Sequence, residues 1–142
     1  PSASQAVERI IDMFPPHERH CAQSQLASLL IGILCQALVP KTGGAGRVAA
    51  VEVMLANPAI RNLIREGKIH QLPNAIRMST QSGMQLLDQA LVDLQRRGLI
   101  TRESVFAFCN DREEIAKLIG EEQTPMKTMG LENGSLARST VK

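Results

Sequence analysis

The stretch that decides the fold runs from Asn57 to His70 and reads Asn-Pro-Ala-Ile-Arg-Asn-Leu-Ile-Arg-Glu-Gly-Lys-Ile-His. It predicts a short helix with both ends marked. Asn57 is a strong N-cap residue, and Pro58 suits the first helical position, where its missing N–H is not needed. Gly67 follows where a left-handed C-cap residue is expected, because glycine takes positive φ without steric cost.

The two faces of this helix differ in character. Ile60, Leu63 and Ile64 are spaced i, i+3 and i+4, and form an apolar stripe that predicts docking onto a core. Arg61 and Arg65 lie four residues apart on the other side, which costs an isolated helix roughly 0.2–0.5 kcal/mol. The paired arginines suggest an anionic partner outside the helix. An ordinary capped surface helix remains the default explanation of the same pattern.

Composition restricts the class of protein. The 142 residues are 44% hydrophobic, which suits one globular domain with a real core. Aromatic residues make up 2%, with no Trp or Tyr, which argues against nucleic-acid recognition by base stacking. The net charge of +2 is too mild to indicate a DNA-binding patch. Cys21, Cys35 and Cys109 are too few and too widely spaced to predict a disulfide framework or a paired-cysteine zinc site.

Two apolar runs around a glycine-rich link predict a β-hairpin. They cover residues 33–39 and 47–55, and the link is Lys41-Thr42-Gly43-Gly44-Ala45-Gly46. Continuation of a helix through Leu38 is the competing interpretation, since short apolar runs are ambiguous. The link is not a P-loop, because that motif places lysine and a hydroxyl after the glycines and opens a helix.

Helices are expected on both sides of the hairpin. A first helix, capped by Ser4, carries Val7, Ile10, Ile11 and Phe14 and ends before Pro15-Pro16. A second helix from about 17 to 31 is expected to be well buried. After the central stretch we expect a helix at 68–78 and a polar break at 79–83. An amphipathic helix should then run through Met84, Leu87, Leu91 and Leu94 to Gly98. We expect two more helices, one capped by Thr101 that runs to Cys109 and one opened by an Asp111/Glu114 capping box that ends at Gly120.

No chemistry can be assembled with specificity from the side chains. His17, His20 and Cys21 fall on one helical face, but a structural zinc site normally takes four ligands and no fourth is evident. No nucleophile–base set, catalytic carboxylate pair or nucleotide fingerprint is present, so no catalytic, cofactor-binding or metal-binding residues are predicted.

A resemblance identifies the family. Ala59-Ile60-Arg61-Asn62-Leu63-Ile64-Arg65-Glu66 resembles, letter for letter, the AIRNLIRE signature of the type IV pilus retraction ATPases, the PilT-like twitching motility proteins of the secretion-ATPase superfamily. Further segments at 8–17, 47–53, 67–71 and 83–91 look like the same family, so the resemblance covers about residues 7–120.

The resemblance implies a fold and an activity. Residues 1–120 would be the C-terminal part of a RecA-like α/β ATPase domain, seen here as a mainly α portion with a small β-hairpin, and residues 121–142 a flexible tail. The intact parent would be a cytoplasmic homohexameric motor, peripheral to the inner membrane, that uses ATP and Mg²⁺ to retract pili with the inner-membrane pilus machinery. The family's Walker A loop, Walker B acid, acidic box and histidine box would precede Pro1, so the chain alone is not expected to hydrolyse ATP. The lack of a four-cysteine zinc module favours the retraction branch.

The expected site is the signature helix itself, Ala59 to Glu66. By resemblance it is needed for retraction but lies away from the chemistry. Ile60, Leu63 and Ile64 would anchor it, while Arg61, Arg65 and Glu66 would face a neighbouring subunit or the pilus machinery. Replacing both arginines with alanine is expected to impair twitching and leave the fold intact. A free-standing helical protein-interaction adaptor is the alternative function, and a DNA-binding module is a distant third.

Overall fold

The computed structural model describes residues 1–120, and the expected tail at 121–142 lies outside them. The elements, in chain order, are α1 (Ala3–Asp12), α2 (Arg19–Leu29), β1 (Gly32–Pro40), β2 (Arg47–Leu55), α3 (Pro58–Arg65), the 3-10 turn η1 (Ile69–Gln71), α4 (Leu72–Arg77), the 3-10 turn η2 (Thr80–Ser82), α5 (Leu87–Arg96), α6 (Arg102–Phe108) and α7 (Arg112–Gly120). The predicted mainly helical fold with one hairpin is therefore confirmed.

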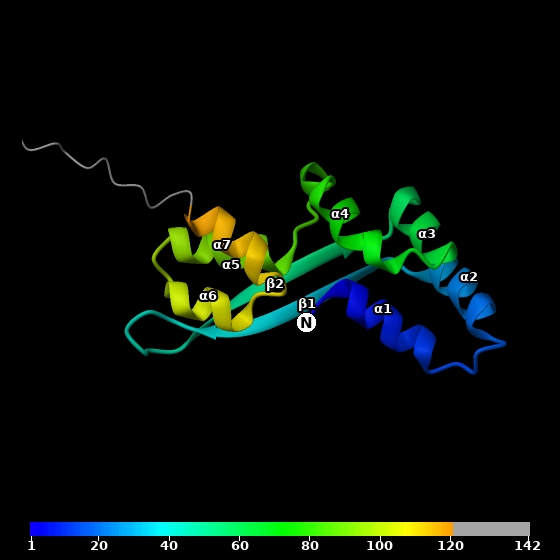
Figure 1. Ribbon diagram of the computed structural model, residues 1–142, viewed down its shortest axis with the longest axis horizontal. Coiled ribbons are helices and arrows are strands. Elements are labelled where there is room, and N and C mark those ends of the chain that lie inside the picture. Colours follow the sequence, from blue (N-terminus) through cyan, green and yellow to red (C-terminus); the bar gives the residue numbers. More distant parts are fainter. Residues whose placement is uncertain (121–142) are drawn as a thin grey trace, which may run out of the picture.

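The β-hairpin forms the axis along which the helices are arranged (Figure 1). Its antiparallel register runs from Gly32 opposite Leu55 to Pro40 opposite Arg47. The glycine-rich link turns the chain with three left-handed residues, whose φ values are 86° at 43, 78° at 44 and 83° at 46. Side chains rarely adopt such angles, which explains the glycines. The hairpin prediction holds, and the competing helix through Leu38 does not form.

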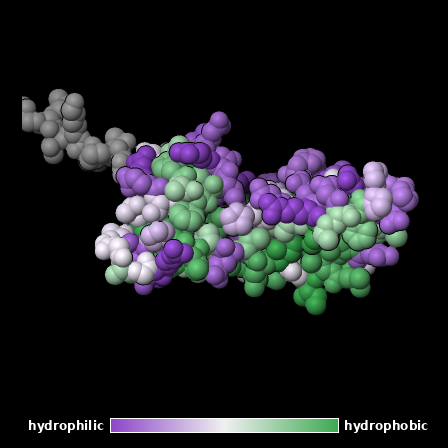
Figure 2. Space-filling model, turned by 90° about the horizontal axis from the view of Figure 1, so that it is seen from below, coloured by the Kyte–Doolittle hydropathy of each residue, from purple (hydrophilic) through white to green (hydrophobic). Residues whose placement is uncertain are grey.

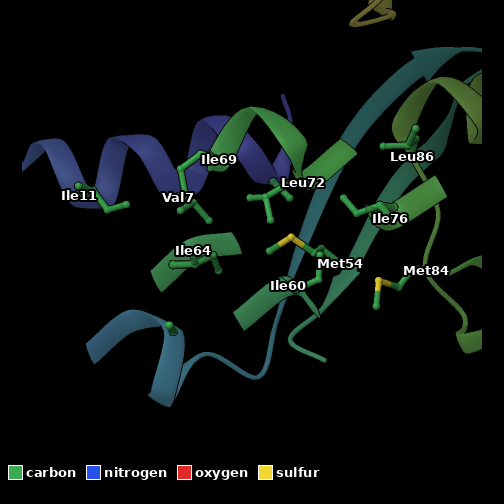
Figure 3. Close-up of a cluster of buried hydrophobic side chains, with 12 residues drawn as sticks. Val7, Ile11, Met54, Ile60, Ile64, Ile69, Leu72, Ile76, Met84 and Leu86 are labelled. Carbon is green, nitrogen blue, oxygen red and sulfur yellow. The ribbon is translucent and has the colours of Figure 1, made fainter. Parts of the chain in front are cut away.

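Two hydrophobic clusters lie at opposite ends of the hairpin (Figure 1). The first gathers α1, α2, α3, η1 and α4 around Met54 of β2. Figure 3 shows its larger side chains pointing inward. The second gathers α5, α6 and α7 on Ala37, Val39 and Ala50. Since both clusters rest on the same two strands, the hairpin fixes the position of the signature helix relative to the α5–α7 end.

One face of the hairpin is left bare. The cross-strand pairs Leu34–Val53 and Leu38–Ala49 lie on the face that the helices do not cover, and Leu34 is 72% exposed. Just before β1, Leu29 and Ile31 are 77% and 85% exposed. Hydrophobic surface gathers on the half of the molecule that carries α1, α2 and the start of β1 (Figure 2). Strands that are apolar on both sides are typical of sheets covered on both faces.

Two expectations at the N-terminal end were wrong. The first helix is capped by Ser2, whose Oγ accepts a hydrogen bond of 3.2 Å from the N–H of Gln5, and Ser4 already lies inside it. The second helix is shorter than expected and not well buried, because it lies at the outer end of the molecule against α3 (Figure 1). Only Ala22 and Ala27 of α2 are buried.

The later helices follow the expected order. Pro73 lies in the first turn of α4, where a proline is tolerated. Met84 is buried but precedes α5, because the next residue, Gln85, exchanges backbone hydrogen bonds of 2.9 and 3.1 Å with Val53 of β2. Thr101 caps α6 as predicted, accepting a hydrogen bond from the N–H of Ser104.

Candidate functional site

The signature helix α3 has the caps that its sequence predicts. Oδ1 of Asn57 accepts a hydrogen bond of 2.9 Å from the N–H of Ile60, and Pro58 opens the helix. At the other end Gly67 has a φ of 70°, and its N–H donates to the carbonyl oxygen of Ile64 over 3.1 Å. These local bonds satisfy backbone groups that a free helix end leaves unpaired. The two ends of the helix are thus set by its own residues.

The apolar stripe docks α3 into the first cluster. Ile60 and Ile64 have 0% of their surface exposed, and both point toward the interior beside Met54 and Val7 (Figure 3). Leu63 packs against the same cluster but is only half-buried. Burying one such side chain fully contributes about 1.5–3 kcal/mol relative to leaving it exposed. The predicted anchoring therefore rests mainly on the two isoleucines.

The two arginines of the signature lie in different surroundings. Nη1 of Arg61 donates hydrogen bonds to the carbonyl oxygens of Ala27 and Ser28, at 2.6 and 2.9 Å, in the last turn of α2. Arg65 is exposed and makes no hydrogen bond or ion pair within the described residues. The like charges four residues apart are thus separated, because one guanidinium is held by backbone oxygens and the other faces solvent.

Glu66 closes the helix with local polar contacts. Its Oε2 lies 2.7 Å from Nζ of Lys68, and its Oε1 accepts a hydrogen bond of 3.0 Å from Nδ2 of Asn62. The hydrogen bond from Lys68, then that from Asn62, lowers the pKa of the Glu66 carboxyl below its ordinary value of 4.5. Glu66 is therefore a carboxylate at neutral pH and offsets charge within the signature itself.

A buried polar junction joins the two clusters, and sequence reasoning missed it. Glu52 of β2 is 2% exposed, and its two oxygens accept hydrogen bonds from the N–H groups of Ala3 and Leu87, at 2.6 and 3.0 Å. These N–H groups open α1 and α5, where a helix dipole favours negative charge. The sequence feature that could have indicated this junction is Glu52 itself, a single acidic residue within an otherwise apolar stretch of strand.

Asp88 extends the junction to α7. Its carboxylate is 6% exposed and accepts hydrogen bonds from the N–H groups of Asn110 and Asp111, at 2.7 and 2.8 Å. Asp111 caps α7 as predicted, but Glu114 does not complete the expected box. Glu114 instead lies 2.7 Å from Arg77 of α4, because that guanidinium is within reach and the N–H of Asp111 is taken by Asp88.

The junction borders a small cavity of about 190 Å³, lined among others by Ser2, Glu52, Arg77, Asp88 and Glu114. Every buried side-chain nitrogen and oxygen of the described residues has a hydrogen-bond partner. The junction ties both clusters to β2.

The other polar residues singled out in the sequence are not brought together into a catalytic site. His17, His20 and Cys21 are exposed at the start of α2. Within residues 1–120 no three His, Cys, Asp or Glu side chains lie close enough to hold a metal ion. The three cysteines are unpaired. No helix of this described part is long and apolar enough to cross a membrane.

Known proteins with similar sequences are pilus motor ATPases. A twitching motility protein of Neisseria gonorrhoeae is 44% identical over 114 residues, which are 80% of this chain and 30% of that protein. The type IV pilus retraction ATPase PilT of Pseudomonas aeruginosa is 46% identical over 103 residues, which are 72% and 30% of the two chains. The chain is a homologue of the pilus retraction ATPases. No protein-family model matches it.

Solved structures place this homologue within the fold. It superposes on the crystal structure of the pilus retraction motor PilT with bound ADP at a TM-score of 0.72 and 37% identity, over 81% of this chain and 32% of that one. The ATPase DotB of Legionella pneumophila shares the fold at a TM-score of 0.60 and 20% identity, over 75% of this chain and 28% of that one. The match lies in the C-terminal part of the PilT ATPase fold, as expected. The chain spans about 30% of the length of the relatives it matches.

Proposed function

We propose that this chain acts as the C-terminal part of an ATP-driven motor that retracts type IV pili and so powers twitching motility. The observation that carries the proposal is the 46% identity to a pilus retraction ATPase. The signature Ala59–Glu66 is folded as a capped, docked helix. ATP and Mg²⁺ would be bound by the part of the motor that this chain does not span, since the chain itself contains no G-x-x-x-x-G-K-[ST] loop.

The bare hairpin face supports membership of a larger ATPase domain. Leu34 and Leu38 are 72% and 48% exposed on one side of the hairpin. Covering such side chains removes apolar area from water, at about 25 cal/mol per Å². A free-standing adaptor would keep this area in water, whereas the part of a RecA-like domain that this chain does not span would bury it. The adaptor function is therefore the weaker alternative.

Within the motor, the proposed task of the signature helix is contact with another protein. Arg65 supports this, because its charge faces solvent and is not used inside the described chain. Its partner would be an acidic surface on a neighbouring subunit of a homohexamer or on the inner-membrane pilus machinery. The motor would work in the cytoplasm at the inner membrane. Arg61 is a poorer candidate for such contact, because α2 already holds its guanidinium.

A chimaera tests the proposal. Residues 7–120 of this chain replace the matching segment of Pseudomonas aeruginosa PilT, and twitching is measured in a strain that lacks its own copy. We expect the chimaera to hydrolyse ATP and to restore twitching. Arg65→Ala in the chimaera is expected to abolish twitching and leave ATP hydrolysis unchanged, while Arg65→Lys, the matched control, keeps the charge and retains it. A chimaera that assembles and hydrolyses ATP but never twitches would contradict the proposed function.

A further inference from the structure

The second helix packs mainly against α3, but little of its own surface is buried. Only two alanines of α2 are buried, and its terminal residue Leu29 is 77% exposed. No side chain caps its N-terminus, and its last turn contains no basic residue to compensate the negative end of the helix dipole. Only a positively charged group from another element can therefore compensate the C-terminal end of α2.

Arg61 is that group. It approaches from α3, more than thirty positions along the chain, and one nitrogen bonds the carbonyl oxygens of both Ala27 and Ser28. Carbonyls in the last turn of a helix lack intrahelical partners, and a cation there also favours the helix dipole. The contact joins the C-terminal end of α2 to the first turns of the signature helix. It lies where α2 leads into β1, since Ile31 pairs with Ala56 just before α3.

The C-terminal end of α3 also lies close to α2, at Gln23 near the middle of that helix. A Cβ placed on Gly67 would lie 3.2 Å from Nε2 of Gln23, tighter than an ordinary contact. The glycine that follows α3 therefore leaves room for the Gln23 side chain of α2. The two helices thus lie against each other both at Arg61 and near Gly67.

We propose that Arg61 is a positioning residue: it pins α2 to α3, so that α2 and the signature helix form one rigid unit. This assigns the two arginines of the signature different tasks, Arg61 holding α2 and Arg65 facing a partner. A partner that contacts the exposed side of the signature helix would then also meet the exposed side of α2. The contact between Arg61 and α2 is inferred from the structure alone, whereas a role for it in retraction rests on the proposed function.

Amide hydrogen exchange of the 142-residue chain tests the pin. In Arg61→Ala the amides of α2 and of Leu30, its C-cap residue, are expected to exchange roughly tenfold faster or more, because hydrogen bonds to a charged group are lost. Amides of α5 in the other cluster are expected to keep their rates. Arg61→Lys should restore part of the protection, since an ammonium can bond a carbonyl but lacks the planar fork. Arg65→Ala is the matched control and should leave α2 unchanged.

Two results would overturn the proposal that Arg61 holds α2 against α3. One is exchange in α2 of Arg61→Ala that stays within about twofold of the unmodified chain, well below the roughly tenfold expected from the lost bonds. The other is equal acceleration in α5, which would make Arg61 a general stability residue. Its use in the motor is tested separately, with Arg61→Ala in the chimaera: ATP hydrolysis is expected to remain and twitching to fall. If α2 of Arg61→Ala exchanges at the normal rate and twitching is lost, Arg61 does not hold α2 in place. If α2 exchanges faster and twitching is normal, the contact exists but is not used in retraction.

Discussion

The carboxylate of Glu52 accepts a hydrogen bond of 3.0 Å from the backbone N–H of Leu87, deep between the two hydrophobic clusters. Its other oxygen takes the N–H of Ala3. One acid on β2 thus fixes the first residues of α1 and of α5, which belong to different clusters. This buried side chain therefore adds a polar link between the two clusters to the packing on their shared hairpin.

Replacing Glu52 with glutamine is expected to lower the free energy of unfolding by about 1–3 kcal/mol, because one buried backbone N–H loses its acceptor. Chemical denaturation followed by far-UV circular dichroism measures the change. Glu8→Gln, an exposed position on α1, is the control and should shift the value by no more than about 0.5 kcal/mol. Equal stability of Glu52→Gln and the unmodified chain would show that the junction does not hold the clusters together.

Shortening the apolar side chains of the signature helix to alanine is expected to lower the free energy of unfolding by different amounts. Ile60→Ala should cost about 2–5 kcal/mol, since this side chain is fully buried and its removal leaves a cavity. Leu63→Ala should cost about 1–2 kcal/mol, because part of Leu63 already faces water. Urea denaturation of the two variants makes the comparison. A larger loss at Leu63 than at Ile60 would contradict the docking described for α3.

The pH dependence of the signature helix has a defined sign at Glu66. The pKa of this carboxyl lies below its ordinary value of 4.5, so its contacts stabilise the folded chain above that pH and are lost as the pH falls through the folded pKa. An NMR titration of the Glu66 side-chain carbonyl carbon is expected to show a midpoint below 4.5. Lys68→Ala should raise that midpoint more than Asn62→Ala. A midpoint that neither substitution moves would exclude these hydrogen bonds as the cause.

The three cysteines are expected to differ in reactivity. Burial raises the pKa of the Cys35 thiol, with Glu52 as the second cause, and burial likewise raises the pKa of Cys109, with Asp88 as the second. Both therefore hold less reactive thiolate near pH 8. Cys21 is exposed on α2. Iodoacetamide labelling followed by peptide mass spectrometry should modify Cys21 first, and labelling of all three at one rate in the folded chain would contradict this expectation.

Local features were predictable from the sequence because each depends on a few adjacent residues. The caps of α3 at Asn57 and Gly67, the glycine turn of the hairpin and the Thr101 cap all follow from the preferences of single residue types for particular backbone angles. The family was predictable for a different reason, since the eight residues of the signature were matched as a pattern.

Tertiary structure alone decided where the polar side chains of the site point. Arg61 and Arg65 are equivalent in the sequence pattern, yet only Arg61 meets the carbonyls of α2, because that helix lies beside one turn of α3. Glu114 was expected to bond within its own helix and bonds Arg77 of another instead. Periodicity tells which face of a helix is apolar, but not which distant element lies opposite it. Packing of the two clusters on a shared hairpin decides which elements lie opposite each other, and the same packing buries Glu52 and Asp88.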